Sequence, residues 1–75
     1  MQREYTIEDP ERQRSMDYAI NNMMTLFQRH GLTVIVNGKQ LILMADTTLE
    51  LIHQQEMAER ALNKNGFAIK LRMIE

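Results

Sequence analysis

The sequence has no cysteine and no tryptophan, and it contains one proline and three glycines in 75 residues. Without cysteine the chain forms neither a disulfide framework nor a thiolate metal site, and an intracellular compartment is the simplest expectation. No stretch approaches the ~20 apolar residues of a membrane span, and the N-terminal segment MQREYTIEDP lacks the apolar run of a signal peptide. We therefore expect a cytoplasmic protein with no membrane partner.

A strong charge of either sign is also missing. The formal net charge is −1, which gives no general attraction to nucleic acid or to an anionic membrane. The composition, 44% hydrophobic and 25% charged, is typical of a globular chain. Residues 1–75 are expected to form one small domain, near the size at which a single core only just outweighs chain entropy. A well-formed helix–sheet interface or an oligomer contact is therefore expected to matter for stability.

Residues 32–44, LTVIVNGKQLILM, predict a β-hairpin around which the domain is organised. An Asn-Gly pair at 37–38 between apolar runs favours a type I′ turn, because both loop positions need positive φ. With that pair as the loop, Val36 faces Lys39 across the hairpin. One face then carries the expected core residues Leu32, Val34, Val36, Leu41 and Leu43. The other face carries Thr33, Ile35, Gln40, Ile42 and Met44.

Two helices flank this hairpin in the sequence. Asp9-Pro10 predicts the start of the first, which Gly31 ends. Its apolar stripe is Met16, Ala19, Ile20, Met23, Met24 and Phe27. Thr47 and Glu50 predict a capping box at the start of the second helix, with Asp46 as the alternative cap. This helix runs to about residue 63 or 64 and is closed by residues 65–66. The packing side of this second helix is Leu51, Met57, Ala58, Ala61 and Leu62.

Alternating polar and apolar residues mark both ends of the chain. Residues 2–8 read as a short strand, with a disordered arm as the alternative. Residues 66–75 read as a last strand. Its two sides are Phe67, Ile69, Leu71 and Met73 on one, and Ala68, Lys70, Arg72 and Ile74 on the other. The predicted class is therefore α+β: two helices packed on one face of an antiparallel sheet, in the order (β)αββαβ. The arrangement is ferredoxin-like if the N-terminal strand pairs, and a three-stranded sandwich if it does not.

No catalytic, cofactor or metal site is predicted. His53 and Glu56 share one turn of the second helix, but a metal site needs three or four ligands. His30 suits a helix end, and Ser15 has no recognisable base nearby in the sequence. The glycines each serve a turn or a helix end, so no phosphate-binding loop remains. We expect a protein that is not an enzyme and needs no cofactor.

The sheet face turned away from the helices, called the open face below, is the predicted functional surface. A merely solvated face alternates cleanly to polar residues, whereas an apolar centre with a charged rim indicates an interaction surface. We expect the hairpin residues of this face to lie beside those of the last strand. Seven residues define the predicted site: Thr33, Ile35, Gln40, Ile42, Met44, Lys70 and Arg72. We expect a small protein-interaction or regulatory module that forms a homodimer through this face and binds another protein, whose identity the sequence does not give.

A nucleic-acid-binding regulator is the alternative, with Lys39, Lys70 and Arg72 on the open face as its basic patch. The segment KQLILMAD carries no aromatic residue that would stack on bases in a βαββαβ sheet. Nucleic acid is therefore the less favoured partner.

Overall fold

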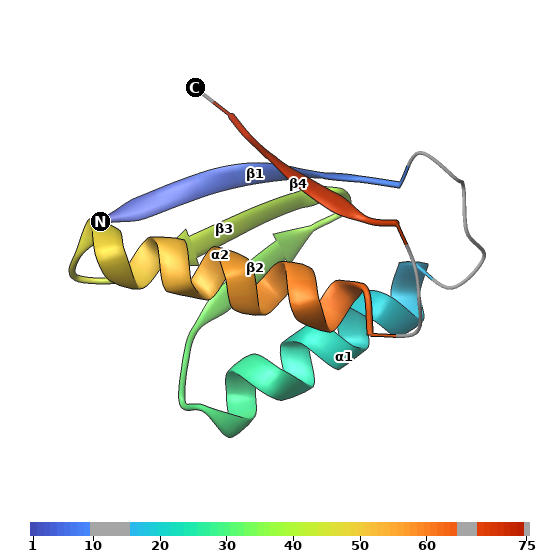
Figure 1. The fold of residues 1–75 in the computed structure, drawn as a ribbon, viewed down its shortest axis with the longest axis horizontal. Helices are drawn as coiled ribbons and strands as arrows, with labels where there is room; N and C mark the ends of the chain where they lie inside the picture. The colour runs from blue at the N-terminus through green and yellow to red at the C-terminus, as the bar shows by residue number, and fades with distance from the viewer. Residues whose placement is uncertain (10–15, 65–67, 75) are drawn as a thin grey trace.

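The computed structural model describes residues 1–9, 16–64 and 68–74 of the chain. These residues form six elements, in the order β1 (Gln2–Glu8), α1 (Met16–Arg29), β2 (Val34–Asn37), β3 (Gln40–Met44), α2 (Thr48–Leu62) and β4 (Lys70–Met73). The strands make one antiparallel sheet in the spatial order β2-β3-β1-β4, and both helices pack on one face of it (Figure 1). The predicted class, α+β with two helices on one face of an antiparallel sheet, is confirmed.

β1 is a central strand, which decides between the strand and the disordered arm that the sequence left open. It pairs antiparallel with β3 on one side and with β4 on the other. Tyr5 and Ile7 are buried on the helix side, while Glu4 and Thr6 alternate to the open face. Because β1 lies between the hairpin and β4, the two edges of the sheet are β2 and β4.

The hairpin forms where predicted, but the predicted register is wrong. Val36 pairs with Leu41 instead of Lys39, and Asn37 is the last residue of β2 rather than a loop residue. The two-residue loop begins at Gly38, whose φ of +61° is the positive value that the first position of a primed turn requires. Each residue of β2 therefore pairs with a residue two positions later in the chain than predicted. Since side chains alternate with a period of two, both predicted faces of the hairpin survive this shift.

Helix α1 ends as the sequence predicts, at a glycine in the left-handed conformation. Gly31 has φ +69°, and the N–H of Leu32 donates to the carbonyl of Phe27 at 2.9 Å, a closure typical of the Schellman motif. This turn sends the chain directly into β2. The predicted helix start at Asp9-Pro10 runs into residues 10–15, which lie outside the described residues.

Helix α2 carries the predicted N-terminal cap with one difference. The N–H of Glu50 donates to Oγ1 of Thr47 at 3.2 Å, and Thr47 is extended, as an N-cap residue should be. The Glu50 carboxylate accepts from the N–H of Asp46 at 3.3 Å, one residue earlier than a capping box expects. Asn63 is the C-cap residue. The predicted stop at 65–66 lies outside the described residues.

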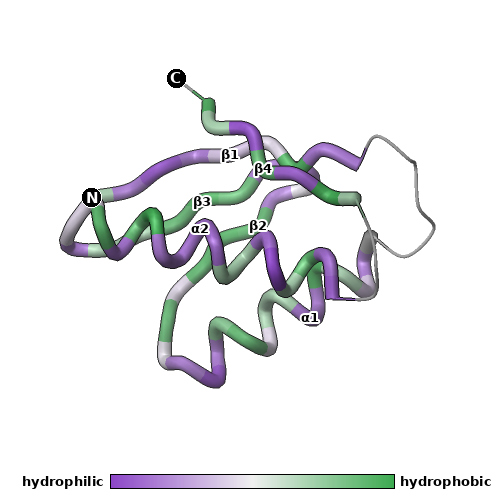
Figure 2. The backbone as a smooth tube through the Cα atoms, in the orientation of Figure 1, coloured by the Kyte–Doolittle hydropathy of each residue, from purple (hydrophilic) through white to green (hydrophobic). Residues whose placement is uncertain are grey.

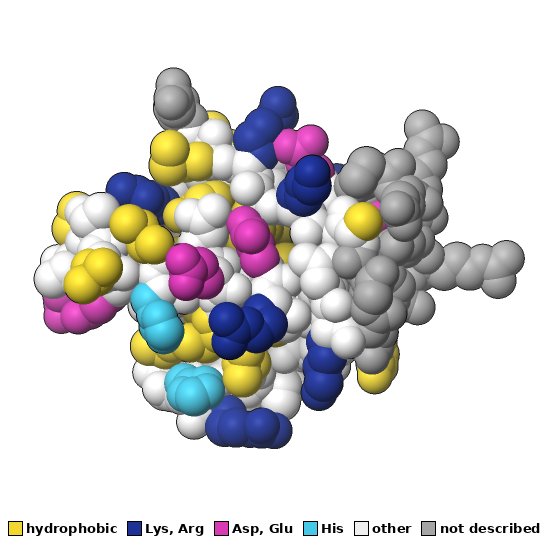
Figure 3. Space-filling view, viewed as in Figure 1, with side chains coloured by type: hydrophobic (Ala, Val, Ile, Leu, Met, Phe, Trp, Pro, Cys, Tyr) yellow, Lys and Arg dark blue, Asp and Glu magenta, His cyan; other side chains and the backbone are white. Residues whose placement is uncertain are grey.

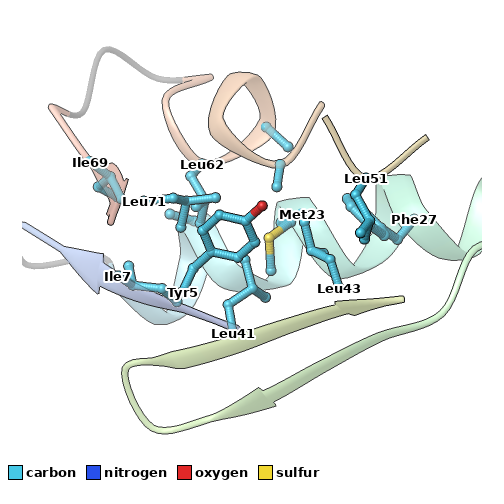
Figure 4. Packing of buried hydrophobic residues seen from close by; sticks show 13 residues of the cluster. Tyr5, Ile7, Met23, Phe27, Leu41, Leu43, Leu51, Leu62, Ile69 and Leu71 are labelled. Atoms are coloured by element: carbon cyan, nitrogen blue, oxygen red, sulfur yellow. The ribbon is translucent and has the colours of Figure 1, made fainter. Parts of the chain in front are cut away.

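The core fills the space between the helices and the inner face of the sheet (Figure 4). The expected core residues Leu32, Val34 and Val36 are only partly buried and pack against its fully buried members. Tyr5 lies at its centre, and its hydroxyl donates to Oε1 of Gln55 at 3.1 Å, so the buried ring keeps a polar partner. The buried hydrophobic residues are Tyr5, Ile7, Ala19, Met23, Phe27, Leu41, Leu43, Leu51, Ala58, Ala61, Leu62, Ile69 and Leu71. Two expected core methionines differ, because Met57 is only partly buried and Met73 is 47% exposed at the end of β4.

Hydropathy alternates along β4 and changes around each turn of the helices, whereas β2 and β3 are hydrophobic over most of their length (Figure 2). Of the helices in the described ranges, none combines the length and the apolar character that crossing a membrane requires.

Candidate protein-interaction surface

The hairpin places its predicted surface residues together on the open face. Ile35 of β2 lies directly opposite Ile42 of β3, and Met44 follows two residues later on the same side of β3. We call Ile35, Ile42 and Met44 the apolar patch. Ile35 is 44% exposed, and the other two side chains are half-buried. By alternation, Thr33, just before β2, and Gln40, the first residue of β3, lie on the same face beside the patch.

The open face is divided, rather than apolar at its centre with a charged rim. On the β1 side of the patch, Gln2 lies opposite Met44 and Glu4 lies opposite Ile42. Lys70 and Arg72 are on β4, beyond β1, at about 10 Å or two strand spacings from β3. The prediction that the hairpin residues lie beside the β4 residues is therefore wrong, because the polar side chains of β1 separate them.

The cations of the predicted basic patch are partly neutralised by this arrangement. Nε of Arg72 forms an ion pair with Oε1 of Glu8 at 3.1 Å, and Lys70 pairs in register with Glu8. Lys39 lies in the hairpin loop, and its carbonyl accepts from Ile7 at 2.7 Å. By alternation Lys39 belongs with the helix-side residues of β3. The three residues are therefore not gathered on one face, and the structure gives little support to a nucleic-acid surface.

The edge strand β2 has backbone groups that no strand covers. The N–H of Ile7 donates to the carbonyl of Lys39, and the N–H of Ala45 donates to the carbonyl of Met1. In an antiparallel pair, bonded and non-bonded residues alternate. Odd-numbered positions of β3 therefore bond to β1, and even-numbered positions bond to β2.

It follows that the backbone N–H and C=O groups of Ile35 and Asn37 hydrogen-bond to β3. Those of Val34 and Val36 point outward, away from the sheet. Apart from the sheet ladder, none of the described residues hydrogen-bonds to the backbone of Val34 or Val36. The strand reads VIVN, so it carries neither charge nor proline, the residues that usually protect an edge.

The opposite edge, β4, is partly protected. The N–H of Ile74 donates to the carbonyl of Glu4 at 2.8 Å, so even-numbered positions of β4 bond to β1 and odd-numbered positions point outward. The Asn63 side chain covers the first outward position: its Nδ2 donates to the carbonyl of Ile69 at 2.8 Å, and its Oδ1 accepts from the N–H of Ile69 at 2.7 Å. Exposed Lys70 and Arg72 flank the rest of this edge.

A shallow groove of about 290 Å³ runs between the β2 edge and α1. It is lined by Met24, Gln28, Leu32, Thr33 and Val34. Met24 is 38% exposed, although the sequence pattern placed it on the apolar stripe of the helix. The groove therefore gives an added strand a partly apolar wall on the helix side.

Sequence reasoning missed Gln54 of α2. Its side chain is 5% exposed, and its Oε1 is buried with no hydrogen-bond partner among the described residues. It lines hollows that also contain Leu32, just before β2. Leu51 and Ala58 are buried three residues before it and four after it, so helical spacing was an available signal, but a polar residue type argued against burial.

Among the described residues, the helix side of the molecule shows no cluster of side chains that suggests a catalytic or metal site. Acidic and basic side chains are spread over it, and the two histidines lie near each other (Figure 3). His30 and His53 are exposed and line a groove with Glu56, but no group of three or more potential metal ligands occurs in residues 1–9, 16–64 and 68–74. Ser15 lies outside the described residues.

Comparison with protein-family models, with curated proteins and with solved structures finds no match for this chain.

Proposed function

We propose that this chain is a non-enzymatic protein-interaction module of a regulatory kind, which works as a homodimer and docks through the open face of its sheet. The observation that carries the proposal is the apolar patch. Ile35 and Ile42 face each other on a sheet surface that neither described helix covers, where a purely solvated sheet would carry polar side chains. Contact with another protein would remove this apolar area from water.

We also propose that the fold is ferredoxin-like. The element order βαββαβ and the strand order β2-β3-β1-β4, with both helices on one side, support this assignment. A fold of this kind hosts many functions, so it adds nothing to the choice between them. It does leave one face of the sheet uncovered by helices, which is the face that the proposal uses.

The docking proposal is tested by Ile42→Glu. A carboxylate in the middle of the apolar patch is costly to bury, so we expect capture of the partner protein to fall at least about tenfold. Quantitative affinity capture from extracts, with the wild-type protein and the variant as parallel baits, measures this. Helical circular dichroism confirms that the variant is folded.

Ile52→Glu is the matched control, because Ile52 is a 41% exposed isoleucine on the outer side of α2. The control should retain the proteins that Ile42→Glu loses. Equal capture by the wild-type protein and Ile42→Glu, or equal loss with both variants, would contradict docking through the open face.

A further inference from the structure

We infer that the β2 edge is the site at which two copies of this chain join, by antiparallel pairing of β2 with β2 of the second copy about a twofold axis at Ile35. This deepens the proposed function, on whose homodimer it rests. The outcome is one continuous sheet across both copies, with the two apolar patches next to each other on a single face.

Hydrogen bonding on this edge is self-complementary. Only the backbone groups of Val34 and Val36 point outward from β2. With the axis at Ile35, Val34 of one copy faces Val36 of the other, and each such pair can exchange both of its hydrogen bonds. A shift of the axis to Val34 would pair Val36 with Leu32, whose N–H already donates to Phe27. The register centred on Ile35 therefore uses every outward group of the strand and pairs each with an outward group of the second copy.

The side chains fit the same register. Ile35 faces Ile35 of the second copy in a non-hydrogen-bonded pair, the class in which side chains approach closest. Thr33 faces Asn37 of the second copy, and both are exposed, uncharged and polar. The strand carries no charge, so the twofold axis brings no like charges together.

The groove beside the edge fits the helix side of the added strand. Val36 of the second copy lies opposite Val34 and therefore on the same side of the sheet. That is the side of the groove, where exposed Met24 offers an adaptable apolar contact. Both sides of the added strand thus meet apolar side chains, Ile35 on the open face and Met24 on the helix side.

Stacking the two open faces is the competing way to form a homodimer, and it fits less well. Glu4 lies opposite Ile42 on the central strand β1, so stacked faces would bury this carboxylate. Pairing through the edge leaves Glu4 in solvent. It also leaves the apolar patches of both copies uncovered for the partner protein.

Ile35→Cys tests the register directly, because the chain has no cysteine of its own. Non-hydrogen-bonded antiparallel pairs have Cα atoms about 4.5 Å apart, within the range that a disulfide bridges. We expect this variant to form a disulfide-linked dimer under mild oxidation, seen on non-reducing gels. Ile74→Cys is the matched control, since Ile74 is a 41% exposed isoleucine on the β4 side of the same face. It should remain a monomer on the same gels.

Light scattering over a dilution series supplies the second arm. The wild-type protein should show a dimer mass that falls to the monomer mass on dilution. Ile35→Lys places like charges opposite each other at the axis and should raise the dimer Kd at least about tenfold, while Ile74→Lys leaves it unchanged.

Three results would overturn the inference: a wild-type monomer at every concentration, equal weakening by both lysine variants, or cross-linking through Ile74→Cys instead of Ile35→Cys. If the wild-type protein is a monomer and still captures a protein that Ile42→Glu loses, the edge dimer is wrong and the docking proposal stands. If the protein is a dimer and Ile42→Glu captures the same proteins as the wild type, the docking proposal is wrong and the edge dimer stands.

Discussion

Both edges of this sheet have backbone groups that point away from the neighbouring strand, and the two edges differ in how those groups are covered. At β4, Asn63 bonds both outward backbone groups of Ile69, and Lys70 and Arg72 place charge along the strand. At β2, the outward groups of Val34 and Val36 have no such cover among the described residues, and the strand is uncharged. Open strand edges can pair with another chain, so an uncharged open edge opposite a charged and partly covered one indicates a site of assembly.

Helix α2 has two amide side chains, Asn63 and Gln54, that differ in the same way as the two edges. Asn63, at its C-terminal end, is fully engaged with Ile69 and with the carbonyl of Glu59. Gln54, in its middle, is buried next to Leu32 at the entry to β2, and its carbonyl oxygen has no partner among the described residues. The Asn63 amide of α2 is thus hydrogen-bonded next to β4, whereas the carbonyl oxygen of the Gln54 amide makes no such bond among the described residues.

Asn63→Ala is expected to have the largest effect on stability. It removes the partners of both Ile69 backbone groups and a third bond to Glu59, and it should lower the free energy of unfolding by about 2 kcal/mol. Urea denaturation followed by circular dichroism measures the loss. Asn63→Asp keeps an acceptor for the Ile69 N–H and should lose less. If Asn63→Ala is as stable as the wild type, the β4 edge is not held in this way.

Gln54→Met is expected to have a smaller effect, of opposite sign. Methionine has a similar length and adapts to irregular space, and the change removes a buried carbonyl oxygen without a partner. We expect the free energy of unfolding to rise by about 1 kcal/mol in the same denaturation assay. A clear loss of stability would mean that the Gln54 amide makes a favourable bond, and the contrast between the two ends of α2 would fail.

Much of the fold could be predicted because its signals are local. The Thr47 cap, the Gly31 stop and the alternation in residues 2–8 each depend on neighbours a few residues apart, and each appears as expected. The hairpin loop was misplaced because both Asn-Gly and Gly-Lys are acceptable two-residue loops. The two faces survived the error because the pairing moved by an even number of residues.

The candidate site depends on information that the sequence holds only non-locally. The placement of β1 between β3 and β4 separates Ile42 from Arg72 and puts Glu4 between them, and no local pattern reports strand order. The same placement makes β2 an edge. The open backbone of Val34 therefore could not be inferred from the letters VIVN alone, which suit a buried strand equally well.

Amide hydrogen exchange across a concentration series tests most directly the claim that β2 is an edge used for assembly. At low concentration, the N–H groups of Ile35 and Asn37 should be protected by β3, while those of Val34 and Val36 exchange rapidly. As the concentration rises through the dimer Kd, protection should appear at Val34 and Val36. Fast exchange at these two positions at every concentration, or new protection at Leu71 and Met73 on the β4 edge instead, would contradict the account.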